Sequence, residues 1–306
     1  MIQTNVQLNP IGAVNHIGLV APTARQLEAQ QEAEVLLFLA QRPLHTVTMV
    51  GFIRDNGLVS PLNRGSFYGY RNAAGNLEGV ALIGHATLIE AHTTEALRAF
   101  AAIAQSGKAT HMVLGERSQV EEFWKGYSVN GQEMRLVCSE FLFELKWPVA
   151  VPAPVTGLRR ATEAELDLVM PVQAEMALEE SGVDPRLMDP LGFAQRCLRR
   201  IQQGRTWVVV KNNKLLFKAE VISDALQVIY LEGIWVNETE RRSGFGASCL
   251  TQLSRELLRR TSSICLLVNQ KNKSAHALYR KSGFRMRSTY DTIFLERPVH
   301  SSGGNS

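Results

Sequence analysis

Several features that define large protein classes are absent from this 306-residue sequence. No apolar run approaches the roughly 20 residues needed to cross a bilayer, and the N-terminal stretch MIQTNVQLNP lacks the basic-then-apolar pattern of a secretory signal. Aromatic residues make up only 7% of the chain and do not alternate with its lysines and arginines, as they would in a nucleic-acid-binding module. We therefore expect a soluble cytoplasmic protein that binds neither membranes nor nucleic acid.

Cysteine is also scarce, and the four cysteines lie far apart in apolar segments: Cys138, Cys197, Cys249 and Cys265. None belongs to a C-x-x-C pair, and the histidines of the first half show no metal-ligand spacing. We expect buried, reduced thiols, with no disulfide framework and no metal site.

The length suggests two domains of about 150 residues each. Three prolines within seven residues, at 148, 152 and 154, favour an extended connector between them. We predict domains at residues 1–150 and 151–306. The first half has 11 basic and 13 acidic residues, a net charge of −2, and the second has 22 and 16, a net charge of +6. This excess of positive charge would suit a phosphate-bearing ligand, and a solvated basic face is the alternative.

The most informative stretch is LEGIWVNETERRSGFGA, residues 231–247. An apolar run typical of a buried strand leads through a polar turn and two glycines into a helical pattern at residues 247–260. Such a junction directs unpaired backbone N–H groups and the positive end of the helix dipole to one place, where a pyrophosphate can bind. Gly244 and Gly246 would let the phosphates approach the backbone, and Arg241 and Arg242 would add charge-assisted hydrogen bonds.

The spacing Arg241-x-x-Gly244-x-Gly246 resembles the acyl-CoA loop of the GNAT superfamily of N-acyltransferases, usually written Arg/Gln-x-x-Gly-x-Gly/Ala. Downstream, a short apolar run at residues 264–268 is followed by NQKNKSAHALYRKSGF, which resembles the second GNAT signature. In that signature a strand ends in Asn, a second Asn or Ser caps a helix, and Ala, Tyr and Gly-Phe follow. Glu238 and Arg242 depart from the family pattern, which often has proline and glycine there.

The resemblance implies that acetyl-CoA is the co-substrate. In the family, the strand before the loop pairs its backbone with the pantetheine arm, as an added strand would. The residues implied to bind acetyl-CoA are Ile234, Trp235, Val236, Arg241, Arg242, Ser243, Gly244, Phe245, Gly246, Ala247, Asn269, Asn272 and Ala275.

Two residues are candidates for the chemistry. Tyr279 matches the family tyrosine often placed near the CoA sulfur as general acid, and a phenol with a pKa near 10 is protonated at pH 7. Glu232 is the candidate general base, because its even separation from Val236 would put both side chains on one face of a strand. Partial burial would raise the pKa of Glu232 toward neutrality. A structural role for Tyr279, and a structural or substrate-binding role for Glu232, are the alternatives.

The first half has the element order of a GNAT domain but no acyl-CoA loop, since His92-Thr93-Thr94-Glu95-Ala96 contains neither a glycine pair nor an arginine. This arrangement resembles tandem-GNAT proteins. We predict an α/β chain of two GNAT-like domains, each a mostly antiparallel twisted sheet flanked by helices. In the first half we expect a helix at residues 24–39, strands at 66–71, 77–83 and 86–91, a helix at 94–104, a strand at 111–114, a helix at 118–127 and closing strands through 134–146.

In the second half we expect a strand at residues 157–162, then a helix capped by Thr162 with Glu165 and reaching about residue 180. A second helix at 189–203 and strands at 206–210, 215–223 and 226–236 should follow. The linker at residues 179–188 would shape the acceptor site, with Glu179 and Glu180 facing an amine or forming a solvated helix end.

The function implied is transfer of an acetyl group from acetyl-CoA to a primary amine of a small molecule or peptide. The alternative is a non-catalytic acyl-CoA-binding regulatory module. The sequence specifies neither the acceptor nor the oligomeric state, for which a dimer is one option.

Overall fold

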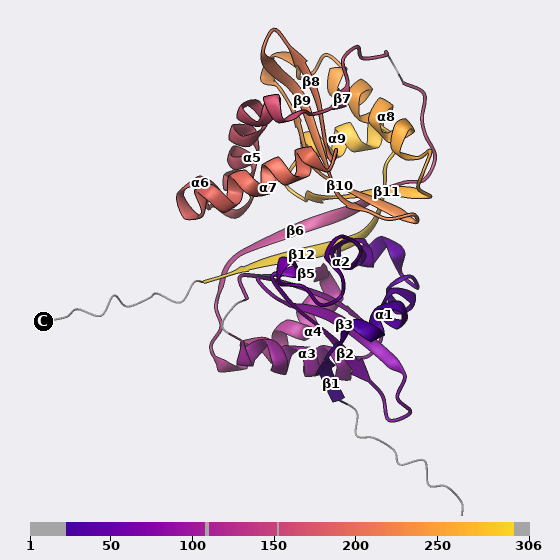
Figure 1. Ribbon diagram of the computed structural model, residues 1–306, viewed down its shortest axis with the longest axis vertical. Helices are drawn as coiled ribbons and strands as arrows, with labels where there is room; N and C mark the ends of the chain where they lie inside the picture. The colour runs from indigo at the N-terminus through magenta and orange to yellow at the C-terminus, as the bar shows by residue number, and fades with distance from the viewer. Residues whose placement is uncertain (1–22, 108–109, 152, 297–306) are drawn as a thin grey trace, which may run out of the picture.

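The computed structural model describes residues 23–107, 110–151 and 153–296, so the N-terminal stretch MIQTNVQLNP and Pro152 lie outside the described residues. Within them the chain forms one mixed sheet of twelve strands, most of them paired antiparallel, with helices on both faces (Figure 1). The strand order is β1-β2-β3-β4-β5-β12-β6-β11-β10-β9-β8-β7. The strands are β1 (Thr23–Gln26), β2 (Gly65–Arg71), β3 (Leu77–Gly84), β4 (Ala86–Ala91), β5 (Met112–Glu116), β6 (Met134–Leu145), β7 (Arg159–Arg160), β8 (Thr206–Lys211), β9 (Lys214–Asp224), β10 (Val228–Val236), β11 (Ser263–Asn269) and β12 (Arg285–Leu295).

The helices divide between two lobes, with α1–α4 in the lower lobe of Figure 1 and α5–α9 in the upper. In the described part of the chain they are α1 (Glu32–Leu39), α2 (Pro43–Asn56), α3 (Thr94–Ser106), α4 (Arg117–Tyr127), α5 (Leu166–Ser181), α6 (Pro185–Met188), α7 (Pro190–Gln202), α8 (Phe245–Leu257) and α9 (Lys273–Lys281). Short 3-10 turns lie at Ala29–Gln31, Pro61–Asn63, Ser128–Asn130, Glu163–Glu165 and Glu238–Glu240.

The two lobes share β6, the last strand of the first half, and β12, the last strand of the second half. In the lower lobe, β5 pairs with β12 and β12 with β6, whereas in the upper lobe β11 pairs with β6, all antiparallel. Each half therefore donates a strand that the other half's sheet needs, and β6 and β12 cross between the lobes in Figure 1. The sheet is continuous across the linker, so the predicted boundary at 150/151 divides the chain without dividing the sheet.

Helix α2 packs across the junction against β9 of the upper lobe. A Cβ on Gly51 would lie 2.3 Å from the Ser223 Oγ, so glycine permits this close approach. The same hydroxyl donates a 2.6 Å hydrogen bond to the carbonyl of Val47. In the last turn of α2, Asp55 forms an ion pair with Arg205 at an N–O distance of 2.5 Å. The halves are thus joined by helix packing as well as by the shared strands.

Most predicted elements are confirmed where local signals are strong. Thr162 and Glu165 form the predicted capping box. Local residues also fix two other chain reversals: Asn212 and Asn213 have positive φ in the β8–β9 turn, and Gly57 ends α2 at φ 84°. The prediction for residues 24–26 was wrong, because they form β1 against β2 instead of the start of a helix. The expected closing strands at 134–146 are one strand, β6, whose lower-lobe partner is β12 from the far end of the chain.

All four cysteines are buried and free, as predicted. No helix among the described residues is both long and apolar enough to span a bilayer.

Candidate functional site

The upper lobe opens where β10 and β11 diverge. These strands pair in parallel only through Val228–Tyr230 and Ser263–Cys265, although β10 continues to Val236 and β11 to Asn269. Beyond the pairing, β10 stays with β9 and β11 stays with β6. The edge of β10 from residue 232 onward therefore faces a space into which another extended chain can fit.

A β-bulge turns β10 at this opening. Glu232 pairs with Glu220, but the next pair is Trp235 with Lys218, so β10 has one more residue than β9 in this interval. Gly233 adopts φ 59°, and its carbonyl accepts a 3.2 Å hydrogen bond from the Lys218 Nζ, which is fully buried. The buried Lys218 side chain of the neighbouring strand β9 therefore stabilises the bulge.

The bulge overturns one sequence-based argument. Directly paired residues point to the same side, and Glu220 and Lys218 are two apart on β9, so Glu232 shares its face with Trp235. Val236 then points to the opposite face, where a Cβ on Gly246 of α8 would meet its Cγ2 at 2.8 Å. The prediction that Glu232 and Val236 share a face was wrong, because the even-spacing rule fails across a bulge.

The predicted acyl-CoA loop lies between β10 and α8. Gly244 is the N-cap of α8 at φ 90°, and a Cβ built there would have no atom within 4 Å. This position therefore requires glycine and leaves open space at the start of a 13-residue helix, as an anion-binding loop does. Gly246 differs from the expectation, because its missing Cβ would point at Val236, so it serves the packing of α8 on β10.

The other loop residues are fixed by local hydrogen bonds. The Arg241 Nε donates a 3.0 Å hydrogen bond to the carbonyl of Val236, and Arg242 has a positive φ of 61°. The Ser243 hydroxyl donates to the Glu240 carbonyl at 2.7 Å and accepts from the Phe245 N–H at 3.2 Å. A groove of about 950 Å³ is lined by Ser243, Gly244 and Phe245 and by residues 153–157 of the linker.

The second predicted motif forms the turn between β11 and α9. Asn269 ends β11, and its side-chain oxygen accepts a 2.9 Å hydrogen bond from the Lys271 N–H. Asn272 caps α9 by accepting from the Ala275 N–H at 3.0 Å. The buried His276 ring lies 3.0 Å from the Asn269 carbonyl through its Nε2. Asn272 is the predicted helix cap.

Tyr279 lies on α9, 7% exposed, and its ring lies 6.1 Å from the ring centroids of both Phe143 and Phe284. Burial raises the pKa of its phenol, so the hydroxyl is neutral at physiological pH. The core around it also contains Leu231 of β10 and Val268 of β11. Tyr279 thus belongs to the layer beneath the diverging strands, and its packing role accompanies any chemical role.

Three carboxylates from three elements, Glu140, Glu180 and Glu232, shift one another's pKa values. Burial raises the pKa of Glu140 of β6 to about 7, and the charge of Glu232 adds to this rise. Burial also raises the pKa values of Glu180, at the end of α5, and of Glu232, and Glu232 and Glu140 each raise that of Glu180 further. Glu180 and Glu232 still reach solvent, as the walls of an open site do.

Hydrogen bonds orient these carboxylates. The Thr292 hydroxyl donates to the Glu140 Oε2 at 2.6 Å, and the Tyr230 hydroxyl donates to the Glu232 Oε1 at 3.2 Å. The positive charge of Arg200 on α7 partly opposes the raised pKa of Glu232. Carboxylates whose pKa values are raised in this way bind a nearby cation and can accept a proton from it.

Sequence reasoning missed several of these residues: Glu140, Arg200, Lys218 and Tyr230. Lys218 and Glu220 are nearly inaccessible and form a 3.3 Å ion pair, which Arg200 extends by bonding Glu220. The available signal was two charged residues at alternate positions in the apolar strand LLFKAEV. Buried charges are rare without a partner or a role. Glu140 gave no such signal, because β6 belongs to the other half of the sequence.

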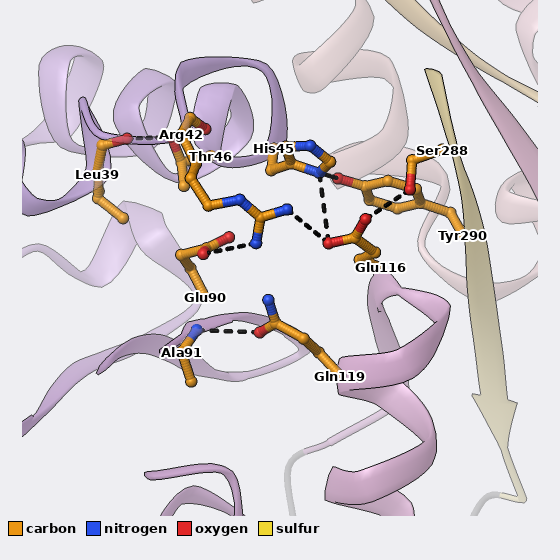
Figure 2. A network of polar contacts seen from close by, with 10 residues as sticks. All are labelled: Leu39, Arg42, His45, Thr46, Glu90, Ala91, Glu116, Gln119, Ser288 and Tyr290. Carbon is orange, nitrogen blue, oxygen red and sulfur yellow. Dashed lines mark hydrogen bonds and ion pairs between the residues drawn. The ribbon is translucent and has the colours of Figure 1, made fainter. Parts of the chain in front are cut away.

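The equivalent opening in the lower lobe is filled by the chain itself (Figure 2). There β4 and β5 pair in parallel only through Ala86–Leu88 and Met112–Leu114. The Ala91 N–H on β4 donates a 3.0 Å hydrogen bond to the Gln119 side chain. The Thr93 hydroxyl accepts from the Ala96 N–H at the start of α3. Backbone donors at this place are thus already in use.

Arg42, just before α2, spans this second opening. Its guanidinium bonds Glu90 of β4 at 2.9 Å and Glu116 of β5 at 2.6 Å. Ser288 of β12 donates to the same Glu116 carboxylate at 2.6 Å, and the His45 Nδ1 lies 2.8 Å from the Tyr290 hydroxyl. Figure 2 shows these side chains converging between the strands.

Comparison with known proteins agrees with this geometry. Residues 219–293, which include both motifs, match the model of the FR47-like protein family. A GNAT-family acetyltransferase from Colwellia psychrerythraea superposes with a TM-score of 0.55 at 13% identity, over 90% of this chain and 100% of that one. A tandem GNAT protein from the clavulanic acid biosynthesis pathway gives 0.57 at 12% identity, over 92% and 100%. The chain has a tandem GNAT fold.

A Drosophila protein also superposes on this tandem GNAT fold, with a TM-score of 0.63 at 14% identity, over 90% of this chain and 99% of that one. No curated protein matches the sequence significantly. The predicted fold class, and the tandem arrangement predicted from the element order of the first half, are confirmed.

Proposed function

We propose that this protein transfers an acetyl group from acetyl-CoA to an amine, and that the reaction takes place in the upper lobe. The observation that carries the proposal is the difference between the two openings. In the upper lobe the diverging strands lead to Gly244, a helix N-cap with open space around it. In the lower lobe the space between the strands is filled, because Arg42 bonds the Glu90 carboxylate and the Gln119 side chain accepts the hydrogen bond of the Ala91 N–H.

The glycine loop fits the phosphates of acetyl-CoA. Gly244 leaves the start of α8 uncovered, and the first N–H groups of a helix have no partner within the helix. The edge of β10 from Glu232 to Val236 would pair with the amides of the pantetheine arm. Arg241, Arg242, Ser243, Phe245, Ala247, Asn269, Asn272 and Ala275 remain proposed binding residues around these two contacts.

The carboxylates suit an amine acceptor. An alkyl amine is an ammonium ion at pH 7 and must lose a proton before it can attack a thioester. Glu232, with its raised pKa, would hold the ammonium and accept this proton, and the positive charge of the ammonium would favour the ionised forms of the neighbouring Glu180 and Glu140. The neutral amine nitrogen then bonds to the carbonyl carbon, the carbon–sulfur bond breaks, the nitrogen releases its second proton to solvent as the amide forms, and the thiolate takes a proton. The neutral phenol of Tyr279 is our proposed donor.

The experiment is a screen of small amines, polyamines and peptide amines with the purified full chain, scored by thiol release from acetyl-CoA. Release that depends on one amine class, together with the acetylated product by mass spectrometry, would support the proposal. A chain that binds acetyl-CoA but releases no thiol with any amine would favour a regulatory acyl-CoA sensor. A chain that does not bind acetyl-CoA would contradict both functions.

A further inference from the structure

A second cavity lies between the lobes, outside the opening between β10 and β11. It has a volume of about 380 Å³ and is walled by the end of α5, α6 and α7 on one side and by β5, β6 and β12 on the other. Figure 1 shows α6 at the left of the upper lobe, on the same side as the end of β12. The size of the cavity falls in the range of small-molecule sites. We call it the inter-lobe groove.

The inter-lobe groove contains three arginines and only one acidic side chain. Arg64, Arg135 and Arg196 line it together with Asp189. Asp189 is bonded to Arg196 at 2.9 Å, and among the described residues Arg64 and Arg135 form no ion pair. All 29 acidic side chains of the sequence belong to described residues, so none outside them could neutralise these arginines.

Local contacts fix the backbone of Arg64 and the side chain of Arg135, the two groove arginines that form no ion pair with a described residue. Arg64 has a left-handed φ of 54°, and its carbonyl accepts a 2.9 Å hydrogen bond from the His85 N–H. A non-glycine residue in this region is strained and persists only where the surroundings fix it. Arg135 is the extra residue of a bulge in β6, donates to the Ser181 carbonyl at 2.8 Å and covers the Phe294 ring.

The positive charges of Arg64 and Arg196 repel each other, because Asp189 is the only acidic side chain of the described residues that lines the groove. Burial, followed by the charge of Arg196, lowers the pKa of Arg64, and Asp189 offsets this only in part. The rings of His85 and His111, whose centroids lie 4.5 Å apart, supply further polar groups in the same groove. An anion placed there would remove the repulsion and accept several charge-assisted hydrogen bonds.

We propose that the inter-lobe groove binds the phosphate or carboxylate group of a small molecule. Ser181 lines this groove, and its neighbour Glu180 belongs to the carboxylate group of the proposed acceptor site. The two places therefore meet at consecutive residues near the end of α5. The anionic group belongs either to the acceptor itself, whose amine would reach Glu180, or to a separate ligand. The first source rests on the proposed function and the second does not.

The test is titration calorimetry of the full chain with inorganic phosphate and, separately, succinate, at constant ionic strength. Saturating acetyl-CoA is present, so that the glycine loop cannot supply the site. We expect saturable binding that Arg64→Gln weakens at least tenfold, because one charge-assisted hydrogen-bond donor group is lost. Arg64→Lys should retain part of it. Arg98→Gln, which removes an exposed arginine from α3, is the matched control and should bind as the wild type does.

Three outcomes decide the proposal. Binding that Arg64→Gln weakens, with acetyl-CoA binding and melting temperature unchanged, would support it. No saturable binding of either anion, or equal binding by Arg64→Gln and Arg98→Gln, would overturn it whatever the fate of the acetyl-transfer proposal. The amine screen identifies the source of the anion. If the acceptor carries it, amines bearing phosphate or carboxylate should react faster than neutral amines in the wild type, and Arg64→Gln should remove this difference. If a separate ligand carries it, these amines should react no faster than neutral amines in the wild type.

Discussion

Glu232 of β10 and Glu90 of β4 occupy equivalent positions, each four residues beyond the first residue of its parallel strand pair. Glu90 is buried and bonded to Arg42, whereas Glu232 reaches solvent and accepts a hydrogen bond only from Tyr230 among the described residues. The same residue type at the same register is therefore neutralised in one lobe and left available in the other. This contrast separates a structural carboxylate from a candidate catalytic one.

The pair of variants Glu232→Gln and Glu90→Gln should have opposite effects. Glu232→Gln removes the proposed proton acceptor, so kcat should fall on the order of 10²-fold, with the free energy of unfolding nearly unchanged. Glu90→Gln leaves Arg42 with one partner fewer in a partly buried network, so stability should fall by about 1–3 kcal/mol with kcat retained. Denaturant unfolding and steady-state rates measure both. Equal rates for the two variants would remove Glu232 from the mechanism.

Gly244→Asp should abolish acetyl-CoA binding. The substitution puts a side chain at φ 90° and a carboxylate where the phosphates are proposed to lie, and we expect affinity to fall by at least 10²-fold in calorimetry. Gly131→Asp is a matched control, since Gly131 also has a positive φ of 82° and open space for a Cβ. If both variants bind acetyl-CoA normally, the loop assignment is wrong.

The raised pKa of Glu140 predicts that stability falls as pH rises. A carboxylate with a pKa of about 7 when folded and near 4.3 when unfolded binds its proton more tightly in the folded protein. Its contribution is therefore present below about pH 4 and is lost as the pH approaches 7. Glu140→Gln should flatten this decline and stabilise the protein by about 1–3 kcal/mol at pH 8. Chemical denaturation at several pH values measures it, with exposed Glu133→Gln as the control.

Gly51→Ala should destabilise the protein, although alanine favours an isolated helix by about 1 kcal/mol. The new Cβ would lie 2.3 Å from the Ser223 Oγ and 2.7 Å from its Cβ, so α2 would have to move off β9. We expect a net loss of about 1–3 kcal/mol, the usual cost of overpacking.

Adding Ser223→Gly to Gly51→Ala removes both clashing atoms and leaves the Cα of residue 223 at 3.3 Å from the new Cβ. The free energy of unfolding of the double variant should therefore fall by less than the sum of the losses in the two single variants. Additive losses in thermal or denaturant unfolding would show that the two positions do not meet.

How far the sequence predicts this molecule depends on whether the signal is local. The Asn212–Asn213 turn, the Thr162 capping box and the Arg241–Gly246 loop are each specified by adjacent residues. The exchange of β6 and β12 is set by pairing between segments about 150 residues apart, which no local pattern encodes. For that reason Glu140 could not be placed beside Glu232 from the sequence. The bulge at Gly233 was not predicted, and the one residue that it inserts moves every later side chain of β10 to the opposite face of the sheet.

Tyr279→Phe decides between the two roles of this tyrosine. It removes one hydroxyl from a ring packed against Phe143 and Phe284, so the free energy of unfolding should fall by at most about 1 kcal/mol. If the phenol protonates the departing thiolate, kcat should fall on the order of 10²-fold with acetyl-CoA affinity nearly unchanged, since the interaction is made in the transition state. A purely structural tyrosine gives the reverse, a lower melting temperature with a nearly normal kcat. Were kcat to stay within about threefold of the wild type, the proton donor would have to be water or the acceptor itself.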